Sequence, residues 1–331
     1  MKYFSRHLYS LLLVPAVLCS LVAPAAAVDP ATIQTYLDKF RKNAGARVET
    51  LAIMGGEDGA SGGAYSFDNN RLNMSINKAG GRGIIGNPEE FDFSSGGIHW
   101  LPLLGGSIGY SEADNKFTNI PALANNIERY TSFAMGFEAG ARIYFTRELS
   151  IGPMLGFIYS HAHSSFEAGS PLGLELKLLY EKQLVDWNMD TMSLVPSLDI
   201  QYEHIFAEDW RMTLSSRFAW FHTWDIATSS KYLGLSGNSS YWENKADLDV
   251  RLPIKVFGHA LHTGGFVAAG LIGGDFGESI NTNSMYTFNG RLVVGDITGL
   301  WKLNWIGIGA SYIKSNTFDG LSWGIDARLI F

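Results

Sequence analysis

The sequence predicts a transmembrane antiparallel β-barrel of about twelve strands. Long stretches alternate apolar and polar residues, and the connections between them alternate between short and long. After residue 27, no apolar run is long enough to cross a bilayer as a helix. The 37 glycines and the 13% aromatic content agree with such a barrel. A closed barrel also satisfies every backbone polar group in lipid, which an open sheet does not.

Residues 1–27 are predicted to be a secretory signal peptide. Basic residues precede an apolar run at 11–18, and residues 25–27 are all alanine, which is a cleavage pattern. An uncleaved membrane anchor is the alternative, and the cleavage pattern favours the signal peptide. The single cysteine, Cys19, lies inside this segment, so the exported chain is expected to contain no disulfide.

The exported chain is expected to be acidic. Removal of the signal peptide takes away Lys2 and Arg6 and leaves 23 basic against 32 acidic side chains, a net charge near −9. A nucleic-acid partner would require a basic face, so none is expected. The composition fits two classes of exported β protein, the soluble sandwich and the outer-membrane barrel.

Residues 28–46 are predicted to form a short amphipathic helix. An Asp-Pro pair supplies an N-cap and a first helical residue, and an Asn-Ala-Gly sequence ends the helix. The helix carries Lys39, Arg41 and Lys42. Two positions stay open. In one the helix plugs the lumen, where these cations meet lumen carboxylates. In the other it lies against the periplasmic rim of the barrel.

Residues 47–331 are predicted to be the barrel domain. In the segment 191–206, apolar residues such as Leu198 and Ile200 alternate with polar residues such as Asp199. Strands of about 15 residues exceed both the roughly 5–6 usual in globular proteins and the 9–11 that cross a bilayer. The expected strands are 62–68, 71–78, 98–112, 130–145, 149–163, 191–206, 210–226, 241–255, 259–275, 284–297, 301–315 and 319–331.

The connections are expected to differ at the two ends of the barrel. Tight turns are predicted at 146–148, 207–209, 256–258 and 297–299, and longer polar loops at 227–240 and 276–283. A soluble sandwich would have similar turns at both ends, so this difference favours the membrane barrel. The segment 164–190 alternates like a strand and also fits a helical stripe. It is interpreted as part of a large loop, and ten or fourteen strands remain alternatives.

The chain resembles a known group of proteins. A short helix followed by about twelve strands, ending in the alternating stretch that closes with Leu329-Ile330-Phe331, is similar to the translocator domain of autotransporters. Its size resembles the solitary outer-membrane autotransporter-like barrel proteins, which lack a passenger.

This resemblance implies a location in the outer membrane of a Gram-negative bacterium. It further implies insertion through the barrel-assembly machinery after escort by periplasmic chaperones, with Trp323, Leu329 and Phe331 in the insertion signal. Outer-membrane lipids and lipopolysaccharide are the expected surroundings, and a monomer without a cofactor is expected.

Two local patterns suggest sharper functions. Residues 81–86 match G-x-G-x-x-G, but Asn-Pro follows where a helix should start, so a flexible loop or turn is predicted instead of a nucleotide site. The cluster Ser160-His161-Ala162-His163-Ser164-Ser165 contains a hydroxyl and a base, as a lipid hydrolase requires. A weak metal site is a second interpretation of the histidines, and a solvated strand end is the favoured one.

The largest group of candidate residues is a set of charged side chains expected to face the lumen. They form either an ion-selective constriction or pairs that stiffen the barrel, and the interspersed signs favour pairs. The residues are Glu138, Arg142, Asp199, Glu203, Arg211, Arg217, Glu243, Lys245, Asp247, Asp249, Arg251, Arg291, Asp326 and Arg328.

Three functions stay open from the sequence. The favoured one is a non-enzymatic barrel that is structural or weakly pore-forming. The second is a barrel-embedded hydrolase of the phospholipase or lipid A deacylase type. The third is a surface binding protein whose extracellular loops use Trp187, Tyr232 and Trp242 as anchors.

Overall fold

The computed structural model describes residues 59–68, 72–94, 96–116, 125–182, 185–207, 210–230, 236–280, 282–295 and 303–329. The predicted signal peptide at 1–27 and the predicted helix at 28–46 lie outside these residues. The elements in chain order are β1 (Gly59–Asp68), β2 (Leu72–Ile84), η1 (Pro88–Glu90), β3 (His99–Lys116), β4 (Ile127–Tyr144), β5 (Leu149–Glu167), α3 (Pro171–Tyr180), β6 (Asn188–Ala207), β7 (Trp210–Thr228), β8 (Ser236–Val256), β9 (His259–Gly274), α4 (Asp275–Ile280), β10 (Ser284–Gly295), β11 (Leu303–Ser315) and β12 (Asp319–Leu329).

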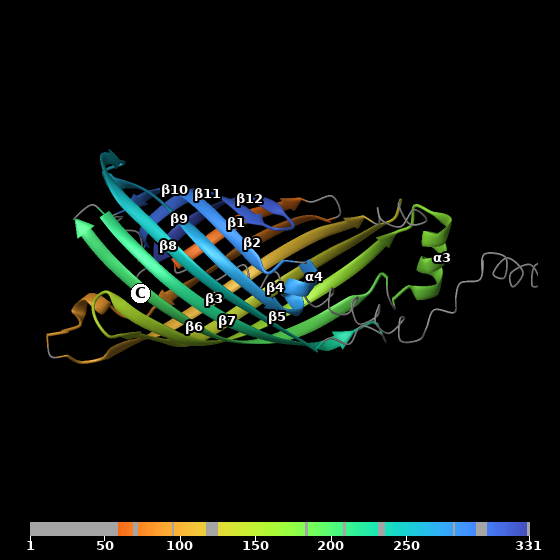
Figure 1. Cartoon of the computed structure of the whole chain (residues 1–331), viewed down its shortest axis with the longest axis horizontal. Coiled ribbons are helices and arrows are strands. Elements are labelled where there is room, and N and C mark those ends of the chain that lie inside the picture. The colour runs from red at the N-terminus through yellow and green to blue at the C-terminus, as the bar shows by residue number, and fades with distance from the viewer. Residues whose placement is uncertain are drawn as a thin grey trace, which may run out of the picture. The chain divides into compact units, whose positions relative to one another are not determined.

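The strands close into one barrel. Each strand pairs antiparallel with its neighbours in sequence, and β1 pairs with β12 to complete the circle (Figure 1). At the closing pair, Gly63 lies opposite Gly324 and Ala64 opposite Trp323. The predicted fold class is confirmed, and the described residues form twelve strands rather than ten or fourteen. No helix within the described ranges has the length and apolarity needed to cross a bilayer.

Side chains alternate between an apolar outer wall and the lumen. On β5, Leu155 and Phe157 face outward and are 46% and 47% exposed, whereas Met154 and Ser160 face inward and are 6% and 1% exposed. Large apolar side chains are exposed on the outer wall of the other strands as well, including Trp323 at 69%. Such a wall is stable in lipid because its backbone groups are paired around the barrel.

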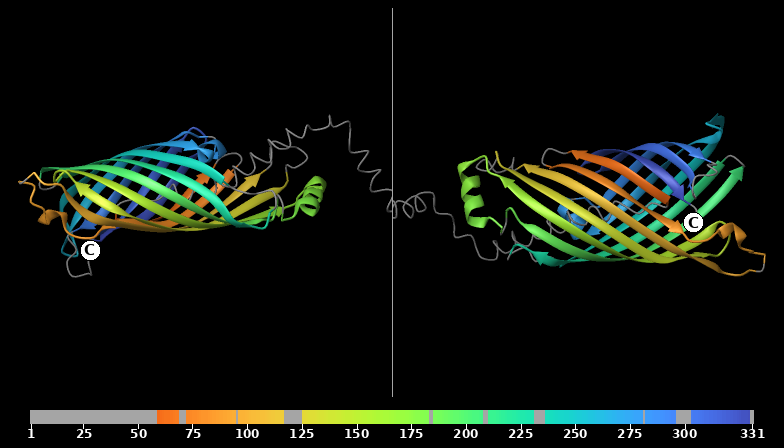
Figure 2. Two further views of the ribbon diagram at one scale, coloured as in Figure 1. Left: turned by 90° about the horizontal axis from the view of Figure 1, so that it is seen from below. Right: turned by 180° about the vertical axis from the view of Figure 1, so that it is seen from behind.

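The strands differ in length around the barrel. Strands β3 to β9 contain 16–21 residues, whereas β1, β2 and β10 to β12 contain 10–13. On β5 the outward residues are apolar or aromatic from Leu149 to Tyr159, and on a tilted strand this run rises roughly 25 Å, the height of the apolar band of outer-membrane barrels. The rest of β5 extends beyond the band on the side of α3 (Figures 1 and 2).

The two ends of the barrel carry different connections. We call the end where residues 145–148 join β4 to β5 the turn end, and the end that carries α3 and α4 the loop end. The predicted loop at 227–240 is wrong in extent, because β7 continues to Thr228 and β8 begins at Ser236. These strand ends are polar on their outward positions, which hid their alternation in the sequence.

Two further predictions are corrected or refined. Residues 81–84 belong to β2, so the predicted flexible loop at 81–86 is wrong for most of its length. Only Gly86, at φ 122°, adopts a turn conformation that favours glycine. In the segment 164–190, β5 continues to Glu167 and β6 begins at Asn188, with α3 between them. The helical stripe was therefore the correct interpretation of its middle part.

The barrel lumen as the candidate functional site

Arginine–carboxylate pairs line the lumen from its middle to the turn end. On β4, Arg142 Nη1 donates to Asp199 Oδ2 of β6 at 2.6 Å, and the two side chains are 1% and 8% exposed. Burial of an isolated charge is costly, so each ion at this depth requires a partner. The structure brings these two predicted residues together.

The pair between Arg142 and Asp199 spans an intervening strand at a glycine. Gly152 of β5 lies between the two strands, and a Cβ added to it would lie 3.4 Å from the guanidinium carbon of Arg142. Leu103 Cδ2 would lie at the same distance from that Cβ. The absence of a side chain at Gly152 therefore leaves room for the arginine to lie flat on the barrel wall.

The same arrangement recurs between β2 and β4. Arg82 pairs with Glu138 through its Nε, and its Nη2 donates to Glu138 Oε2 at 3.2 Å. In the strand registers, Arg82 lies opposite Gly105 of β3, which lies opposite Glu138. A Cβ on Gly105 would lie 2.6 Å from Glu138 Cγ, so this position is restricted to glycine while the pair exists.

A third pair of this kind lies on the opposite wall. Arg291 on β10 donates to both carboxylate oxygens of Asp247 on β8, at 2.8 and 2.6 Å. Gly264 of the intervening β9 lies opposite Arg291, and its added Cβ would lie 3.4 Å from Arg291 Nε. Both Arg291 and Asp247 were predicted lumen residues. The paired geometry is the strong, bidentate form of this interaction.

Further charges surround this third pair. Asp326 on β12 interacts electrostatically with Arg291 and with Lys245, and Lys245 Nζ lies 5.1 Å from the centre of the Phe266 ring. Asp249 Oδ1 forms a hydrogen bond with Nδ1 of His262 at 2.8 Å. The wall formed by β8 to β12 therefore holds charges of both signs close to one another.

One further pair links strands that are not neighbours. Arg217 Nη2 on β7 lies 3.5 Å from Glu138 Oε2 on β4. Strands β5 and β6 separate β4 from β7 along the wall, so this contact passes through the lumen. Glu138 therefore contacts Arg82 and Arg217 at once, which links β2, β4 and β7.

The remaining predicted lumen residues lie nearer the turn end. Arg211 Nε is 3.5 Å from Glu203 Oε1, and these side chains are 43% and 31% exposed. Arg251 is exposed near the β8–β9 turn. The side chain of Arg328 lies outside the described set. Surface pairs of this kind contribute little to stability.

An apolar layer fills the lumen on the loop-end side of the charges. On β4, the apolar Ala134 lies closer to the loop end than Glu138 does. On β7, Phe221 lies closer to the loop end than Arg217 does. Tyr241 joins the layer and donates its hydroxyl to Glu243 at 2.6 Å. The contacting residues of the layer are Ile76, Ala134, Val195, Ala219, Phe221, Tyr241, Ile272, Phe276, Met285 and Ile313, which are 0–8% exposed.

Strands all around the barrel contribute to the apolar layer. Its members come from β2, β4, β6 to β11 and α4, so they lie on all sides of the barrel. Side chains around a water-filled channel remain accessible to water, whereas these are almost fully buried. Burial of this kind is typical of a lumen that is filled by side chains.

The loop end contains a second buried region. Ser193 Oγ and Thr223 Oγ1 are 2.7 Å apart and fully buried, and Trp187 packs against Tyr130 with ring centres 6.0 Å apart. Trp187 is 1% exposed, so its predicted role as a surface anchor is wrong. Of the other two predicted anchors, Trp242 is exposed on the outer wall and Tyr232 lies outside the described residues.

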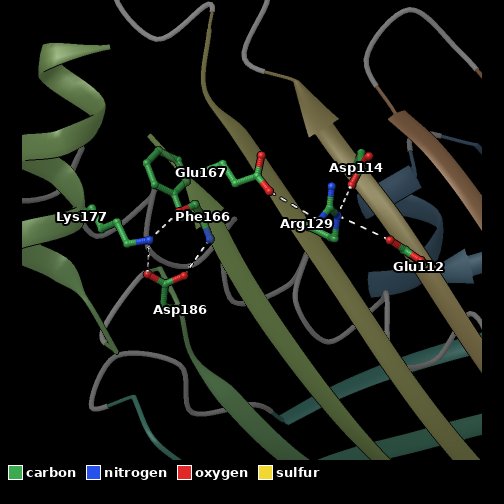
Figure 3. A network of polar contacts seen from close by, with 7 residues as sticks. All are labelled: Glu112, Asp114, Arg129, Phe166, Glu167, Lys177 and Asp186. Carbon is green, nitrogen blue, oxygen red and sulfur yellow. Dashed lines mark hydrogen bonds and ion pairs between the residues drawn. The ribbon is translucent and has the colours of Figure 1, made fainter. Parts of the chain in front are cut away.

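The loop that carries α3 is fixed to the barrel (Figure 3). Lys177 Nζ donates to Phe166 O at 2.8 Å and lies 3.4 Å from Asp186, whose Oδ1 accepts from Phe166 N at 2.7 Å. The fully buried Asn126 accepts from Gly169 N at 2.8 Å. These contacts hold α3 at a defined place beyond β5.

On the outer wall nearby, one arginine joins three strands (Figure 3). Arg129 of β4 lies 3.0 Å from Asp114 and 3.4 Å from Glu112 of β3, and 3.5 Å from Glu167 of β5. All four side chains are at least one-third exposed, so the contribution of each pair to stability is small.

Two of the three serines in the proposed hydrolase cluster lie on the opposite face of the barrel wall from the histidines. Ser160 and Ser164 face the lumen and are 1% and 0% exposed, whereas His161 and His163 face outward. A nucleophile and its base must lie within hydrogen-bonding distance. Alternation along β5 places Ser160 and Ser164 on the opposite face from the imidazoles, whereas Ser165 shares the outward face with His161 and His163.

Together, the apolar outer wall, the closed antiparallel sheet and the filled lumen define an integral β-barrel of the outer-membrane class. Residues 60–322 match the family model described as "Solitary outer membrane autotransporter beta-barrel domain". The chain belongs to this family, and the resemblance inferred from its sequence is confirmed. The protein is therefore located in the outer membrane of a Gram-negative bacterium. In such barrels the short turns face the periplasm, so the loop end is extracellular.

Three solved structures of autotransporter barrels are similar to this chain, and the first of them shows the same fold. The β domain of the Bordetella autotransporter BrkA is 11% identical, with a TM-score of 0.50, over 82% of this chain and 99% of that one. The transport unit of AIDA-I from Escherichia coli is 10% identical (TM-score 0.47, 88% and 99% covered), and the translocator domain of NalP from Neisseria meningitidis is 11% identical (TM-score 0.48, 89% and 98% covered). The comparison with curated proteins found no match.

Proposed function

We propose that this protein is a non-enzymatic outer-membrane barrel with a sealed lumen, which serves as a rigid support for structures outside the membrane. The apolar layer across the lumen carries the proposal, because it joins strands on opposite walls and excludes water. The charged layer supports it, since its arginines lie against the wall in defined pairs. Such pairs stiffen a barrel and leave few free charges to select ions.

The extracellular part of the barrel is the functional surface in this proposal. Strands β3 to β9 extend past the apolar band, and α3 is held at their end. Leu174 and Leu178 of α3 are 55% and 80% exposed. Apolar side chains exposed at a fixed position favour contact with another molecule, which retains surface binding through the loops as the second candidate function.

Biogenesis is proposed to follow that of other outer-membrane barrels. Residues 1–27 direct export, periplasmic chaperones escort the chain, and the barrel-assembly machinery inserts it. Trp323 is 69% exposed on the outer wall of the last strand, as an insertion signal in that strand requires. Leu329 ends β12, and its side chain and Phe331 lie outside the described residues. The inserted monomer is surrounded by phospholipid and lipopolysaccharide, with no nucleic-acid partner.

Two measurements test this proposal. In a liposome-swelling assay with a small sugar, the purified full chain is expected to give the swelling rate of protein-free vesicles. A rate that rises with the amount of protein would refute a sealed lumen. Overexpression in an outer membrane is expected to leave the phospholipid and lipid A profiles unchanged, and new hydrolysis products would refute the non-enzymatic assignment.

A further inference from the structure

Two histidines stand side by side on the outer wall of β5, just beyond the apolar band. The outward residues of this strand are apolar or aromatic up to Tyr159, and His161 and His163 follow. The His161 side chain is 49% exposed. Their place beyond the hydrocarbon puts both imidazoles at the level of water and lipid headgroups.

Each imidazole is oriented by the residue directly opposite it on β6. His161 lies opposite Asp190, and His163 lies opposite Asn188. The Nδ1 atoms are 2.7 Å from Asp190 Oδ1 and 2.6 Å from Asn188 Oδ1. Tyr159 donates its hydroxyl to the same oxygen of Asp190 at 2.8 Å, which fixes the carboxylate in turn.

These hydrogen bonds decide which ring nitrogen is available. A carboxylate or amide oxygen accepts, so Nδ1 carries the proton in the neutral imidazole and Nε2 keeps its lone pair. No hydrogen bond to Nε2 of His161 or His163 is found among the described residues. A histidine that donates Nδ1–H to an oxygen and presents Nε2 has the arrangement found in metal-ligating histidines.

We propose that His161 and His163 bind one divalent transition-metal ion, such as Zn²⁺ or Cu²⁺, through their Nε2 atoms, with Asp190 and Asn188 as positioning residues. Residues two apart on one strand face are adjacent, so both imidazoles reach one ion. Within the described residues, no group of three or more His, Cys, Asp or Glu side chains gathers at one point. The site therefore supplies two protein ligands, and water or a headgroup phosphate oxygen fills the other positions.

The chain contains a matched control for this site. His222 on β7 also faces outward, and its Nδ1 is 2.9 Å from Asn238 Oδ1 on the opposite strand. Its neighbours on the same face are Trp220 and Trp224, with ring centres 5.7 and 5.6 Å away. His222 thus has the same kind of support but no second imidazole beside it.

Isothermal titration of the tag-free, metal-stripped full chain in detergent with ZnCl₂ and with CuSO₄ tests the proposal. One saturable equivalent is expected, with Cu²⁺ bound more tightly than Zn²⁺. The double variant His161→Ala with His163→Ala is expected to lose this equivalent, and His222→Ala to keep it. Asp190→Asn is expected to weaken binding by about 10–100-fold, because it removes the charge that raises the basicity of His161.

A shift of each variant on a heat-modifiability gel establishes that it is folded. Saturable binding that survives in the double variant would overturn the assignment to His161 and His163. The absence of saturable binding in the wild-type chain would overturn the site altogether. Binding that depends on His222 as strongly as on His161 would show that single surface imidazoles account for it.

Discussion

Arg142 on β4 and Asp199 on β6 form a 2.6 Å hydrogen bond over Gly152 on the strand between them. Two further arginines, Arg82 and Arg291, reach carboxylates over glycines in the same way. Each pair links strands that share no backbone hydrogen bonds. The charged layer thus fixes the order of three strands at a time, in addition to filling the lumen.

Loss of one partner of this pair is expected to destabilise the barrel strongly. Arg142→Ala removes the arginine partner of the buried Asp199, which costs about 3–5 kcal/mol. The urea midpoint of unfolding in detergent measures the effect. Arg142→Met combined with Asp199→Leu is expected to recover most of the loss, because it removes both charges.

The exposed pair between Lys314 and Asp319 is the control for this prediction. Its atoms are 2.7 Å apart, but the side chains are 52% and 50% exposed. Lys314→Ala is therefore expected to change stability by less than about 0.5 kcal/mol. Equal effects of Lys314→Ala and Arg142→Ala would contradict the structural role of the lumen pair.

A methyl group at Gly105 is expected to separate Arg82 from Glu138. The added Cβ would lie 2.6 Å from Glu138 Cγ, so the carboxylate must move at a cost of roughly 1–3 kcal/mol. The adjacent Gly106 faces the other side, where a Cβ meets only Gly136 O at 3.6 Å. The temperature of the gel-mobility shift should fall for Gly105→Ala and stay unchanged for Gly106→Ala. The reverse order would refute the contact.

Deletion of Phe331 is expected to lower assembly in the outer membrane. The reason is that the barrel-assembly machinery is proposed to recognise the last strand, and the terminal aromatic residue is part of the recognised signal. Pulse-chase labelling followed by membrane fractionation should show slower insertion and more periplasmic degradation. Deletion of the exposed turn residue Phe257 serves as a control for a missing aromatic residue. Normal assembly without Phe331 would show that this residue is not part of the insertion signal.

The periplasmic turn is expected to weaken in acid. Hydrogen bonds from His204 and then Tyr202 lower the pKa of Glu148 below its ordinary value, and His204 Nδ1 lies 2.7 Å from Glu148 Oε1. A lowered folded-state pKa means that this stabilisation is present above the pKa of the unfolded chain. It is lost as the pH falls through the folded-state pKa. Unfolding midpoints between pH 3 and 6 should therefore vary less for Glu148→Gln than for the wild type. Identical profiles would contradict the prediction.

The sequence predicted the barrel because alternation is set by the strand itself. Residues such as Leu198 and Asp199 face opposite sides in any strand, so lipid-facing and lumen-facing sets follow without tertiary information. The strand ends were harder to predict. Beyond the apolar band, both faces of β7 and β8 meet polar surroundings. Both faces therefore carry polar residues there, and the alternation of apolar and polar residues disappears.

The closure of the lumen could not be predicted in the same way. Which charges meet depends on register and on the strand that lies between them, as Gly152 between Arg142 and Asp199 illustrates. Arg82 was missed because the glycines around it suggested a loop. Every second residue from Ile76 to Arg82 faces inward. This alternation was the signal in the sequence that could have placed Arg82 in a strand.

The predicted plug helix at 28–46 is not part of the described structure, but its expected partners are. Lys39, Arg41 and Lys42 were expected to meet the lumen carboxylates Asp199, Glu203, Asp247 and Asp249. Of these, Asp199 and Asp247 already pair with arginines of the barrel. The apolar layer is formed by residues of the barrel and α4, so the proposed seal does not require this helix. The plug and the sealed wall therefore predict different results when the helix is removed.

Planar-bilayer recording of the purified full chain and of a variant without residues 28–46 tests the sealed lumen most directly. Both proteins are expected to show no steady conductance above the bare bilayer. Phe221→Ala combined with Tyr241→Ala, which removes two large side chains from the apolar layer, is expected to conduct. Steady conductance of the full chain, or conductance that appears on removal of residues 28–46 alone, would contradict a lumen closed by the barrel wall.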